Sequence, residues 1–385
     1  MNKSLTPFKE PVYVTRPLLP NLSHFTDKLA EIWDARWLTN DGPQHKMLEN
    51  KLSEYLRVPH LSLFNNGTIA LIVACQSLRL SGEVITTPFT FPATPHVLSW
   101  NGIRPVFCDI DPETMNIDSS RIESMITPQT TAILGVHVFG TPCDVFGIQE
   151  IADRYGLRVV YDAAHAFGVE IEERGIGTFG DVSMFSFHAT KLFHTAEGGA
   201  LTYNNLNQKQ RVDLLKNFGI KNQEEVMMPG INGKMNELQA ALGLVMLDYL
   251  EAERSKRKEI QELYHKLLSK IEGISFYESD RSALKLSYQY FVIRVDAAKF
   301  GMSRNELFDE LKKYNIYSRK YFHPLCSEYA CYRHIPSANN ANLPVANKIA
   351  SEVLALPYYG GLSLDDVEKI CEIISDVRFA VGQYV

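Results

Sequence analysis

The chain has 385 residues, a formal net charge of −6, 45% apolar residues and 22% charged residues. This length exceeds what one small core needs and indicates one large and one smaller domain. The acidic balance argues against a nucleic acid or an anionic membrane surface as the main partner. No apolar run approaches 18 residues and the N-terminal stretch has no apolar signal core, so we expect neither a membrane span nor secretion. Six cysteines without a CxxC pair are typical of reduced thiols in a cytoplasmic protein.

In chain order, the first 40 residues predict an extended segment with a helix around 24–37. From there to about residue 205, short β-branched or aromatic runs alternate with helical patterns. We expect helices from residue 67 and at 146–156, and strands at 60–64, 83–88, 104–110, 130–140, 157–164 and 181–187. This alternation predicts an α/β fold whose largely parallel sheet is covered on both faces, with ligands at the carboxyl ends of the strands.

The second half of the chain begins with a long helical pattern over residues 235–272. Its apolar positions recur on one helix face: Leu238, Leu242, Val245, Met246 and Tyr249. Further strands are expected at 274–278, 288–295 and 316–322, and helices at 303–315, capped by Ser303, and 362–381. We therefore expect an N-terminal segment over 1–40, a large α/β domain over 41–254 and a small α+β domain over 255–385.

The stretch NNGT (65–68) lies between an expected strand and an expected helix. Gly67 allows a close backbone approach, the N–H groups of the helix start point outward, and Thr68 adds a hydroxyl donor. This pattern indicates an anion site, and a plain helix-capping turn is the alternative.

A carboxylate and two aromatic side chains follow other expected strands. Asp162 comes directly after an apolar run, and a buried carboxylate needs a cationic partner such as a protonated ring nitrogen. His165 could hydrogen-bond the same ligand, although an Asp that caps the next turn is the alternative. Phe89 and Phe91 follow the strand at 83–88, where either could pack in the core or cover a planar ring.

The stretch SFHATKLFHTAEGGAL (186–201) contains two histidines and one lysine. His188 and His194 are six positions apart, which suits neither one helix face nor metal ligation, so we expect no metal site. Lys191 is either a solvated surface lysine or, shielded by aromatic neighbours, a nucleophilic amine. A phosphate cradle, a carboxylate for a ring nitrogen, an aromatic cover and a lysine for an aldehyde together match pyridoxal phosphate.

The blocks VVYDAAHAFG, SFHATKLFHTAEGGALT and GINGKMNELQAALG resemble those of the DegT/DnrJ/EryC1/StrS family of nucleotide-sugar aminotransferases. The similarity runs from WLTNDGPQHKMLENKLSEYL to IYSRKYFHPL. It implies the fold-type I architecture, a mixed and mostly parallel sheet flanked by helices with a smaller C-terminal α+β domain, and pyridoxal 5′-phosphate as cofactor. By matching position, it implies that Lys191 bonds covalently to the coenzyme and carries the proton between C4′ of the coenzyme and the substrate carbon.

The resemblance also implies roles for other residues by position. Asp162 matches the partner of the ring nitrogen, His165 the residue near the ring hydroxyl and Phe91 the stacking ring. Phosphate contacts are implied for Gly67, Thr68 and Ser186. Asn232 matches an asparagine that reaches the phosphate of the neighbouring subunit, which implies a homodimer with shared active sites.

Departures from the family pattern bear on the activity. Some relatives have His at the position of Lys191 and act as sugar dehydratases, so the lysine favours amine transfer. Phe193, His194 and Lys234 replace residues that are common in the family, without touching the covalent chemistry. A pyridoxal-phosphate-dependent dehydratase and a non-catalytic regulator of the same fold are the alternatives.

The choice of sugar is implied by shorter matches. WLTNDGP, NNGT and YSRKYFHPL most resemble relatives that aminate C4 of a dTDP-4-keto-6-deoxyhexose, whereas ATKLF is also similar to relatives that aminate C3. We expect transfer of the amino group of L-glutamate to C4 of dTDP-4-keto-6-deoxy-D-glucose, with amination at C3 as the alternative. Lys234, Arg319 and His323 are candidates for binding the sugar nucleotide, because a basic fork suits a diphosphate; solvated surface residues are the alternative.

Overall fold

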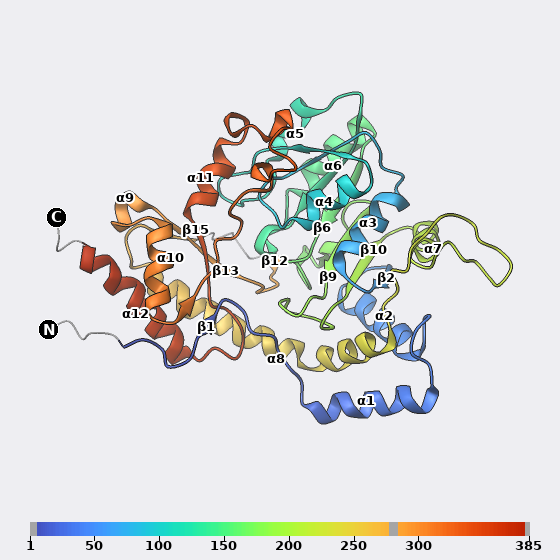
Figure 1. Ribbon diagram of the computed structural model, residues 1–385, viewed down its shortest axis with the longest axis horizontal. Helices are drawn as coiled ribbons and strands as arrows, with labels where there is room; N and C mark the ends of the chain where they lie inside the picture. The colour runs from blue at the N-terminus through green and yellow to red at the C-terminus, as the bar shows by residue number, and fades with distance from the viewer. Residues whose placement is uncertain (1–5, 277–283, 382–385) are drawn as a thin grey trace.

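The computed structural model describes residues 6–276 and 284–381 (Figure 1). Its centre is a seven-stranded sheet in the order β2-β10-β9-β6-β5-β3-β4. Strand β10 is antiparallel to both neighbours, β2 and β9, and the pairs from β9 to β4 are parallel. The strands are β2 (His60–Phe64), β3 (Glu83–Thr86), β4 (Arg104–Phe107), β5 (Thr130–Val136), β6 (Arg158–Asp162), β9 (Val182–Ser186) and β10 (Gly199–Tyr203). The expected α/β class is confirmed; β10 is an element that the sequence patterns did not predict.

Helices cover both faces of this sheet, because the strands carry apolar side chains on both sides. One face packs against α3 (Gly67–Ser77), α4 (Ala93–Trp100) and α7 (Leu206–Leu215). The other packs against α2 (Pro43–Tyr55), α6 (Val145–Tyr155) and the first half of α8 (Glu237–Leu268). The short helix α5 (Ser119–Ile122) precedes β5.

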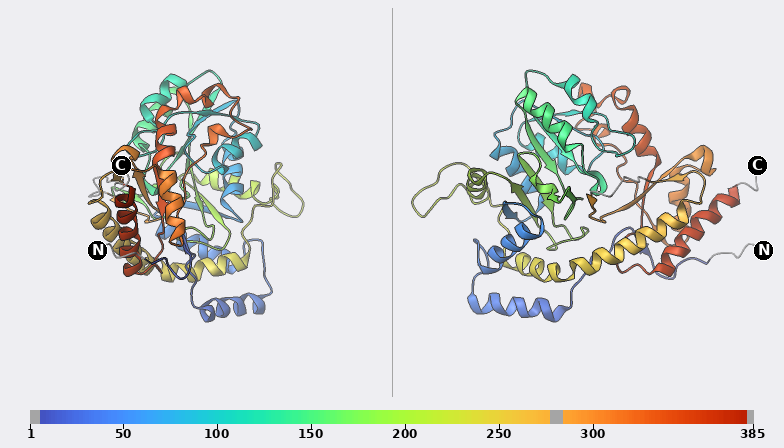
Figure 2. Two further views of the ribbon diagram at one scale, coloured as in Figure 1. Left: turned by 60° about the vertical axis from the view of Figure 1, so that its left-hand side comes forward. Right: turned by 180° about the vertical axis from the view of Figure 1, so that it is seen from behind.

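Helix α8 connects two cores, and Figure 2 shows it running along the lower side of the molecule from one to the other. Its first half packs on the large sheet through Leu244 and Leu250, and its second half packs in another core through Tyr264 and Leu268. Leu238, which belongs to the expected apolar face, is 39% exposed. The predicted domain boundary at 254/255 falls inside this helix, between the two packed halves, and the division into three segments stays a prediction.

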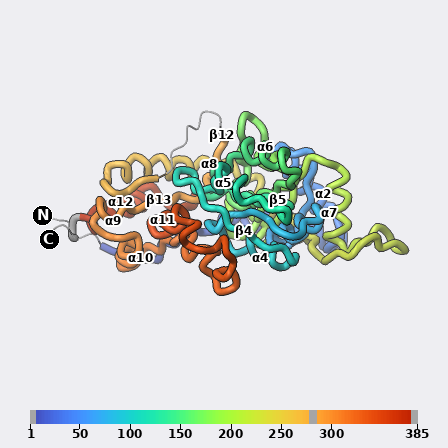
Figure 3. Tube along the Cα trace, turned by 90° about the horizontal axis from the view of Figure 1, so that it is seen from above, coloured from blue at the N-terminus to red at the C-terminus, as the bar shows by residue number. Residues whose placement is uncertain are grey.

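The second core contains a three-stranded sheet in the order β11-β13-β15. Its strands are β11 (Ile274–Ser275), β13 (Phe291–Val295) and β15 (Val353–Leu356), and the surrounding helices are α9 (Ala297–Phe300), α10 (Arg304–Lys313), α11 (Pro344–Glu352) and α12 (Leu364–Val381). Ser303 caps α10 as predicted, since its hydroxyl accepts from the Glu306 N–H at 3.2 Å. The last two residues of the strand expected at 274–278 lie outside the described residues. Figure 3 shows this second body at one end of the molecule.

Further elements lie outside these two sheets. Strand β1 (Val12–Tyr13) pairs with β14 (Ile316–Tyr317), the only part of the strand expected at 316–322 that forms in the described chain. Helix α1 (Leu22–Ala35) packs on α8. Strand β12 (Leu284–Lys285) pairs with β7 (Glu170–Ile171), which also pairs with β8 (Arg174–Gly175). Within the described residues, no helix is both long and apolar enough to span a bilayer.

Candidate active site

The ends of three strands meet where helix α3 begins. Strand β2 leads into Gly67, β9 ends at Ser186 and β10 begins at Gly199. A Cβ atom added to Gly67 would lie 3.2 Å from Cβ of Ser186, and one added to Gly199 would lie 2.7 Å from the Gly67 nitrogen. A side chain at position 199 would therefore clash with the backbone of Gly67, and one at position 67 would crowd Met184 and Ser186. The helix start, the exposed Thr68 and the partly exposed Ser186 form the cradle for an anion that NNGT predicts.

Asp162 ends strand β6 with its carboxylate buried. One oxygen accepts from the Thr94 hydroxyl at 2.8 Å and the other from the Ala164 N–H at 3.1 Å. Burial raises the pKa of Asp162, opposed by these two hydrogen bonds and by the charge of Lys191. Because both hydrogen-bond donors are uncharged, the carboxylate is suited to a further, cationic N–H partner.

His165 follows Asp162 by three residues and is also buried. Its Nδ1 accepts from the Phe139 N–H at 3.2 Å, which places the proton of the neutral ring on Nε2. Burial and the nearby charge of Lys191 hold the pKa of His165 well below its ordinary range. Parallel rings of Phe139 and Phe322 lie 6.2 and 6.0 Å away between centroids, so the imidazole plane is fixed.

Lys191 is the lysine of the loop that links β9 to β10, and its side chain is partly buried. Burial lowers the pKa of Lys191 to about 8, although the nearby carboxylate of Asp162 and hydroxyl of Tyr321 act in the opposite direction. Its Nζ lies 5.9 Å from the ring centroid of Tyr290. A substantial fraction of this amine is neutral near physiological pH, as a nucleophilic lysine requires.

The two histidines of the same loop have separate surroundings. His188 is exposed, with Nδ1 2.8 Å from the Thr190 hydroxyl, whereas His194 is buried, with Nε2 2.7 Å from the Leu18 carbonyl. His194 thus connects the loop to the N-terminal segment. Across the described chain, residues 6–276 and 284–381, no group of three or more His, Cys, Asp and Glu side chains is arranged to hold a metal ion.

The structure separates Phe89 from Phe91. Phe89 is fully buried against Phe139 and Phe322, whereas Phe91 is 56% exposed at the start of the turn into α4. The carbonyl of Phe91 accepts from the N–H of Thr94, whose hydroxyl binds Asp162. Phe91 is therefore the aromatic residue of this pair that is free to cover a ring bound at Asp162.

Asn232 and Lys234 lie on the segment that leads into α8. The residue between them, Gly233, contacts the NNGT stretch that forms the anion cradle: its carbonyl accepts from the Asn65 N–H at 2.9 Å. Asn232 and Lys234 therefore both lie beside the cradle. Asn232 is exposed. The Lys234 amine donates to Asn217 at 2.7 Å and lies over the Phe218 ring. The hairpin between 217 and 232 projects away from the body (Figures 1 and 2).

Arg319 and His323 differ in their relation to this site. Arg319 pairs through its backbone with Ala355 of β15, and its guanidinium donates to the hydroxyl of Tyr321 at 3.0 Å. Tyr321 is close enough to Lys191 for its hydroxyl to act on the amine, so Arg319 is brought to the edge of the site. His323 is exposed, and the charges that act on it belong to Arg304, Glu328 and Lys320, none of which is a site residue.

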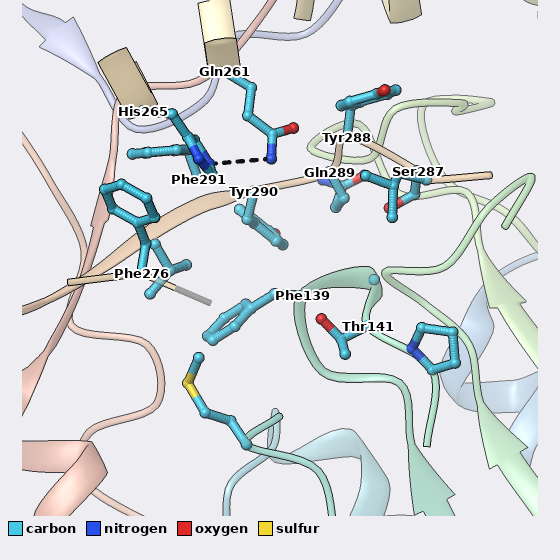
Figure 4. Close-up of a pocket in the computed structure, with 15 residues that line it drawn as sticks. Phe139, Thr141, Gln261, His265, Phe276, Ser287, Tyr288, Gln289, Tyr290 and Phe291 are labelled. Carbon is cyan, nitrogen blue, oxygen red and sulfur yellow. Dashed lines mark hydrogen bonds between the residues drawn. The ribbon is translucent and has the colours of Figure 1, made fainter. Parts of the chain in front are cut away.

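The sequence patterns missed several residues of this site. Thr94 binds Asp162 but reads as an ordinary residue at a helix start, and Tyr290 and Tyr321 fall within patterns typical of strands. A cavity beside the site is lined by Phe139, Thr141, Ser287 and Tyr290, among others. Figure 4 shows that it lies between the loop after β5 and the segment before β13. No local sequence signal joins these two segments, which only the fold brings together.

The sheet order, the cradle and the lysine facing a buried carboxylate define an enzyme of the aminotransferase class. The model of the DegT/DnrJ/EryC1/StrS aminotransferase family matches residues 22–375, and the chain belongs to this family. This confirms the resemblance seen in the sequence and the activity class that it implied.

Relatives and solved structures agree with this assignment. The chain is 49% identical over 364 residues to a dTDP-4-amino-4,6-dideoxy-D-glucose transaminase of Escherichia coli, covering 94% of this chain and 97% of the relative. The crystal structure of DesI in the presence of its TDP-sugar product has a TM-score of 0.92 and 33% identity, covering 98% and 97% of the two chains. The PLP form of a putative sugar aminotransferase of Streptococcus pneumoniae has a TM-score of 0.88 and 26% identity, covering 96% and 99%.

Proposed function

We propose that this aminotransferase transfers the amino group of L-glutamate to C4 of dTDP-4-keto-6-deoxy-D-glucose, using pyridoxal 5′-phosphate, in the biosynthesis of a deoxyamino sugar. The observation that carries the proposal is Lys191, a partly buried lysine with a pKa of about 8, held beside buried Asp162. The 49% identity to a dTDP-4-amino-4,6-dideoxy-D-glucose transaminase supports the choice of sugar.

The residues present fit the coenzyme. Gly67, Thr68 and Ser186 would hold its phosphate in a cradle that a Cβ atom at Gly67 would crowd. Asp162, buried with two uncharged donors, would bind the protonated ring nitrogen, and exposed Phe91 would cover the ring. When bound, the coenzyme supplies an electron sink for the carbon that gains or loses the amine.

The chain's own residues then position groups and move protons. The amine of Lys191, neutral in part near pH 8, can accept at Nζ the proton that leaves the α-carbon of glutamate and would release it to the coenzyme carbon that receives the amine; for the keto sugar the proton would move in the opposite direction. His165 is neutral with its proton on Nε2, so it offers a hydrogen-bond donor without a charge. Arg319, beside Tyr321, and Lys234, beside the cradle, would bind the diphosphate of the sugar nucleotide, with His323 as a third candidate.

A homodimer with shared sites is part of the proposal. Asn232 is exposed beside the cradle of its own chain, on a segment whose hairpin projects from the body. The hairpin exposes apolar side chains: Phe218, Ile220, Val226, Met227 and Ile231. An exposed apolar patch of this kind marks a protein interface, and we place the partner's cradle opposite Asn232. The cytoplasm as the place of this reaction stays a prediction from the sequence.

One reaction tests the proposed function. The protein is incubated with dTDP-4-keto-6-deoxy-D-glucose, L-glutamate and pyridoxal phosphate, and the product is analysed by NMR. We expect an amine at C4 and formation of 2-oxoglutarate. An amine at C3 would instead support the alternative that ATKLF suggests, and loss of a hydroxyl without amine transfer would indicate a dehydratase.

A variant of the covalent residue provides the control. Lys191→Ala removes the amine but leaves the cradle and Asp162 unchanged, so we expect coenzyme to bind and turnover to disappear. Transamination by this variant would contradict the role proposed for Lys191. Absence of any coenzyme-dependent absorbance in the unmodified protein would contradict the use of pyridoxal phosphate altogether.

A further inference from the structure

Gln289 holds the main chain on both sides of Lys191. Its side chain is 2% exposed, its Oε1 accepts from the Leu192 N–H at 2.7 Å, and its Nε2 donates to the Thr190 carbonyl at 3.0 Å. One amide therefore satisfies a donor and an acceptor that flank the lysine. The only residue between these two contacts is Lys191 itself.

The segment that contains Gln289 is itself fixed by helix α8. Arg254 donates to the Leu286 carbonyl at 2.6 Å, and Arg257 donates to the Tyr288 carbonyl at 3.3 Å. Arg257 is buried and held in turn by Glu253 at 2.6 Å. The amide of Gln289 thus acts from a rigid support that runs directly into β13.

Gln289 belongs to the second body, which contains the three-stranded sheet, and not to the large sheet that carries Lys191. Strand β13 follows two residues later and is the central strand of the small sheet, whereas Lys191 lies in a loop of the large sheet. The next residue, Tyr290, places its ring 5.9 Å from the Lys191 amine. Any displacement of this segment relative to the large sheet would therefore move the main chain of Lys191.

We propose that Gln289 is a positioning residue that sets where the Lys191 amine lies, through its paired hydrogen bonds to Thr190 and Leu192. This inference rests on the function proposed for Lys191. Without the amide, a buried N–H and a carbonyl lose their partners, and the loop must shift or admit water to satisfy them. A shift of the order of 1 Å in a reacting group is enough to slow catalysis markedly.

A change in the position of the Lys191 amine would change its pKa, and this pKa can be measured. The groups that face Lys191 are Asp162 and His165 from the large sheet, and Tyr290 and Tyr321 from the small body, with Arg319 bound to Tyr321. Burial among these groups lowers the pKa of Lys191 to about 8. An amine that gains contact with water moves back toward the ordinary lysine value.

The test uses Gln289→Met, which keeps the length of the side chain but removes both hydrogen bonds. The full chain without added coenzyme is treated briefly with acetic anhydride across a pH series, and acetylation of Lys191 is quantified by mass spectrometry. We expect the pKa of Lys191 to rise by about one unit. In the loaded enzyme, kcat for the glutamate half-reaction should fall about tenfold with little change in KM.

Gln208→Met is the matched control. Its amide donates to Ser77 at 2.7 Å, at the opposite end of α3 from the cradle, so Lys191 should keep its pKa and rate. If Gln289→Met does not fold, Gln289→Asn, which keeps a neutral amide but is one methylene too short to reach both partners, is measured instead with the same expected direction. An unchanged Lys191 pKa and kcat in a folded Gln289 variant would overturn the inference, even if its melting temperature falls.

Failure of the proposed function gives a different result. It would appear in the unmodified protein as a Lys191 pKa near that of a free lysine and no coenzyme-dependent absorbance. Failure of the Gln289 inference leaves both properties of the unmodified protein intact.

Discussion

The Lys191 amine reacts only when it is neutral, and its environment decides how much of it is neutral. Burial lowers its pKa from 10.5 to about 8. The neutral fraction therefore grows as the pH rises, reaches one half near pH 8 and levels off roughly one pH unit higher. We expect the rate at which the coenzyme-free protein captures added pyridoxal phosphate to follow this curve, measured by stopped-flow absorbance. A midpoint near 10.5 would show that the lysine is solvated.

Asp162 contributes a charge rather than only a hydrogen bond. Asp162→Asn removes the negative charge that a protonated ring nitrogen needs, so we expect kcat for transamination to fall at least about 100-fold. Thr94→Val keeps the carboxylate and removes only one of its donors, so the loss should be nearer tenfold. Steady-state kinetics with L-glutamate distinguish the two. Equal losses in both variants would mean that the geometry of Asp162, not its charge, matters.

At the scale of elements, the cradle depends on how closely β2, β9 and α3 approach. Gly67→Ala would place a Cβ 3.0 Å from the sulfur of Met184 and 3.2 Å from Cβ of Ser186, so strand β9, which forms one side of the cradle, would have to shift. We expect coenzyme affinity to fall about tenfold, which corresponds to about 1.4 kcal/mol. Absorbance titration measures this change. Gly361→Ala is the control, because its Cβ would come no closer than 3.7 Å to a neighbouring atom, the ring of Tyr359. This variant should bind the coenzyme with normal affinity.

The expected strands of the parallel sheet were all found, because strands buried on both faces have continuous apolar runs. Val159, Val160 and Tyr161 illustrate this, since neighbouring side chains enter different cores. Strand β10 was missed because its five residues begin with a glycine and follow the Lys191 loop directly, so the end of the loop and the start of the strand are not separated in the sequence. The strand expected at 316–322 is short because the residues after Tyr317 turn toward the site instead of continuing the pairing.

The candidate site, too, could be predicted from the sequence only in part. Asp162 and Lys191 could be predicted because a strand end and a recognisable loop identify them within one body. Thr94, Tyr290 and Gln289 could not, since their roles depend on contacts between segments far apart in the chain. His323 stays a prediction from the sequence, whereas Arg319 lies beside Tyr321, which faces Lys191.

At the scale of the whole molecule, the exposed hairpin predicts that the chain is incomplete as a monomer. Val226 is 68% and Met227 55% exposed, which is costly for apolar side chains in water. We propose that a partner covers this patch and that Asn232 enters the partner's cradle. A homodimer arranged around a twofold axis would then contain two equivalent sites, each built from both chains.

Complementation between two inactive variants tests this arrangement. Lys191→Ala lacks the amine, and Asn232→Ala should lose activity at limiting coenzyme because the phosphate loses a donor. In a mixed dimer, one site combines an intact Lys191 with an intact Asn232 from the other chain. Random exchange makes half of the dimers mixed, each with one restored site, so about a quarter of full activity should return. If each site is built within one chain, mixing restores nothing, and the exposed hairpin must serve another contact.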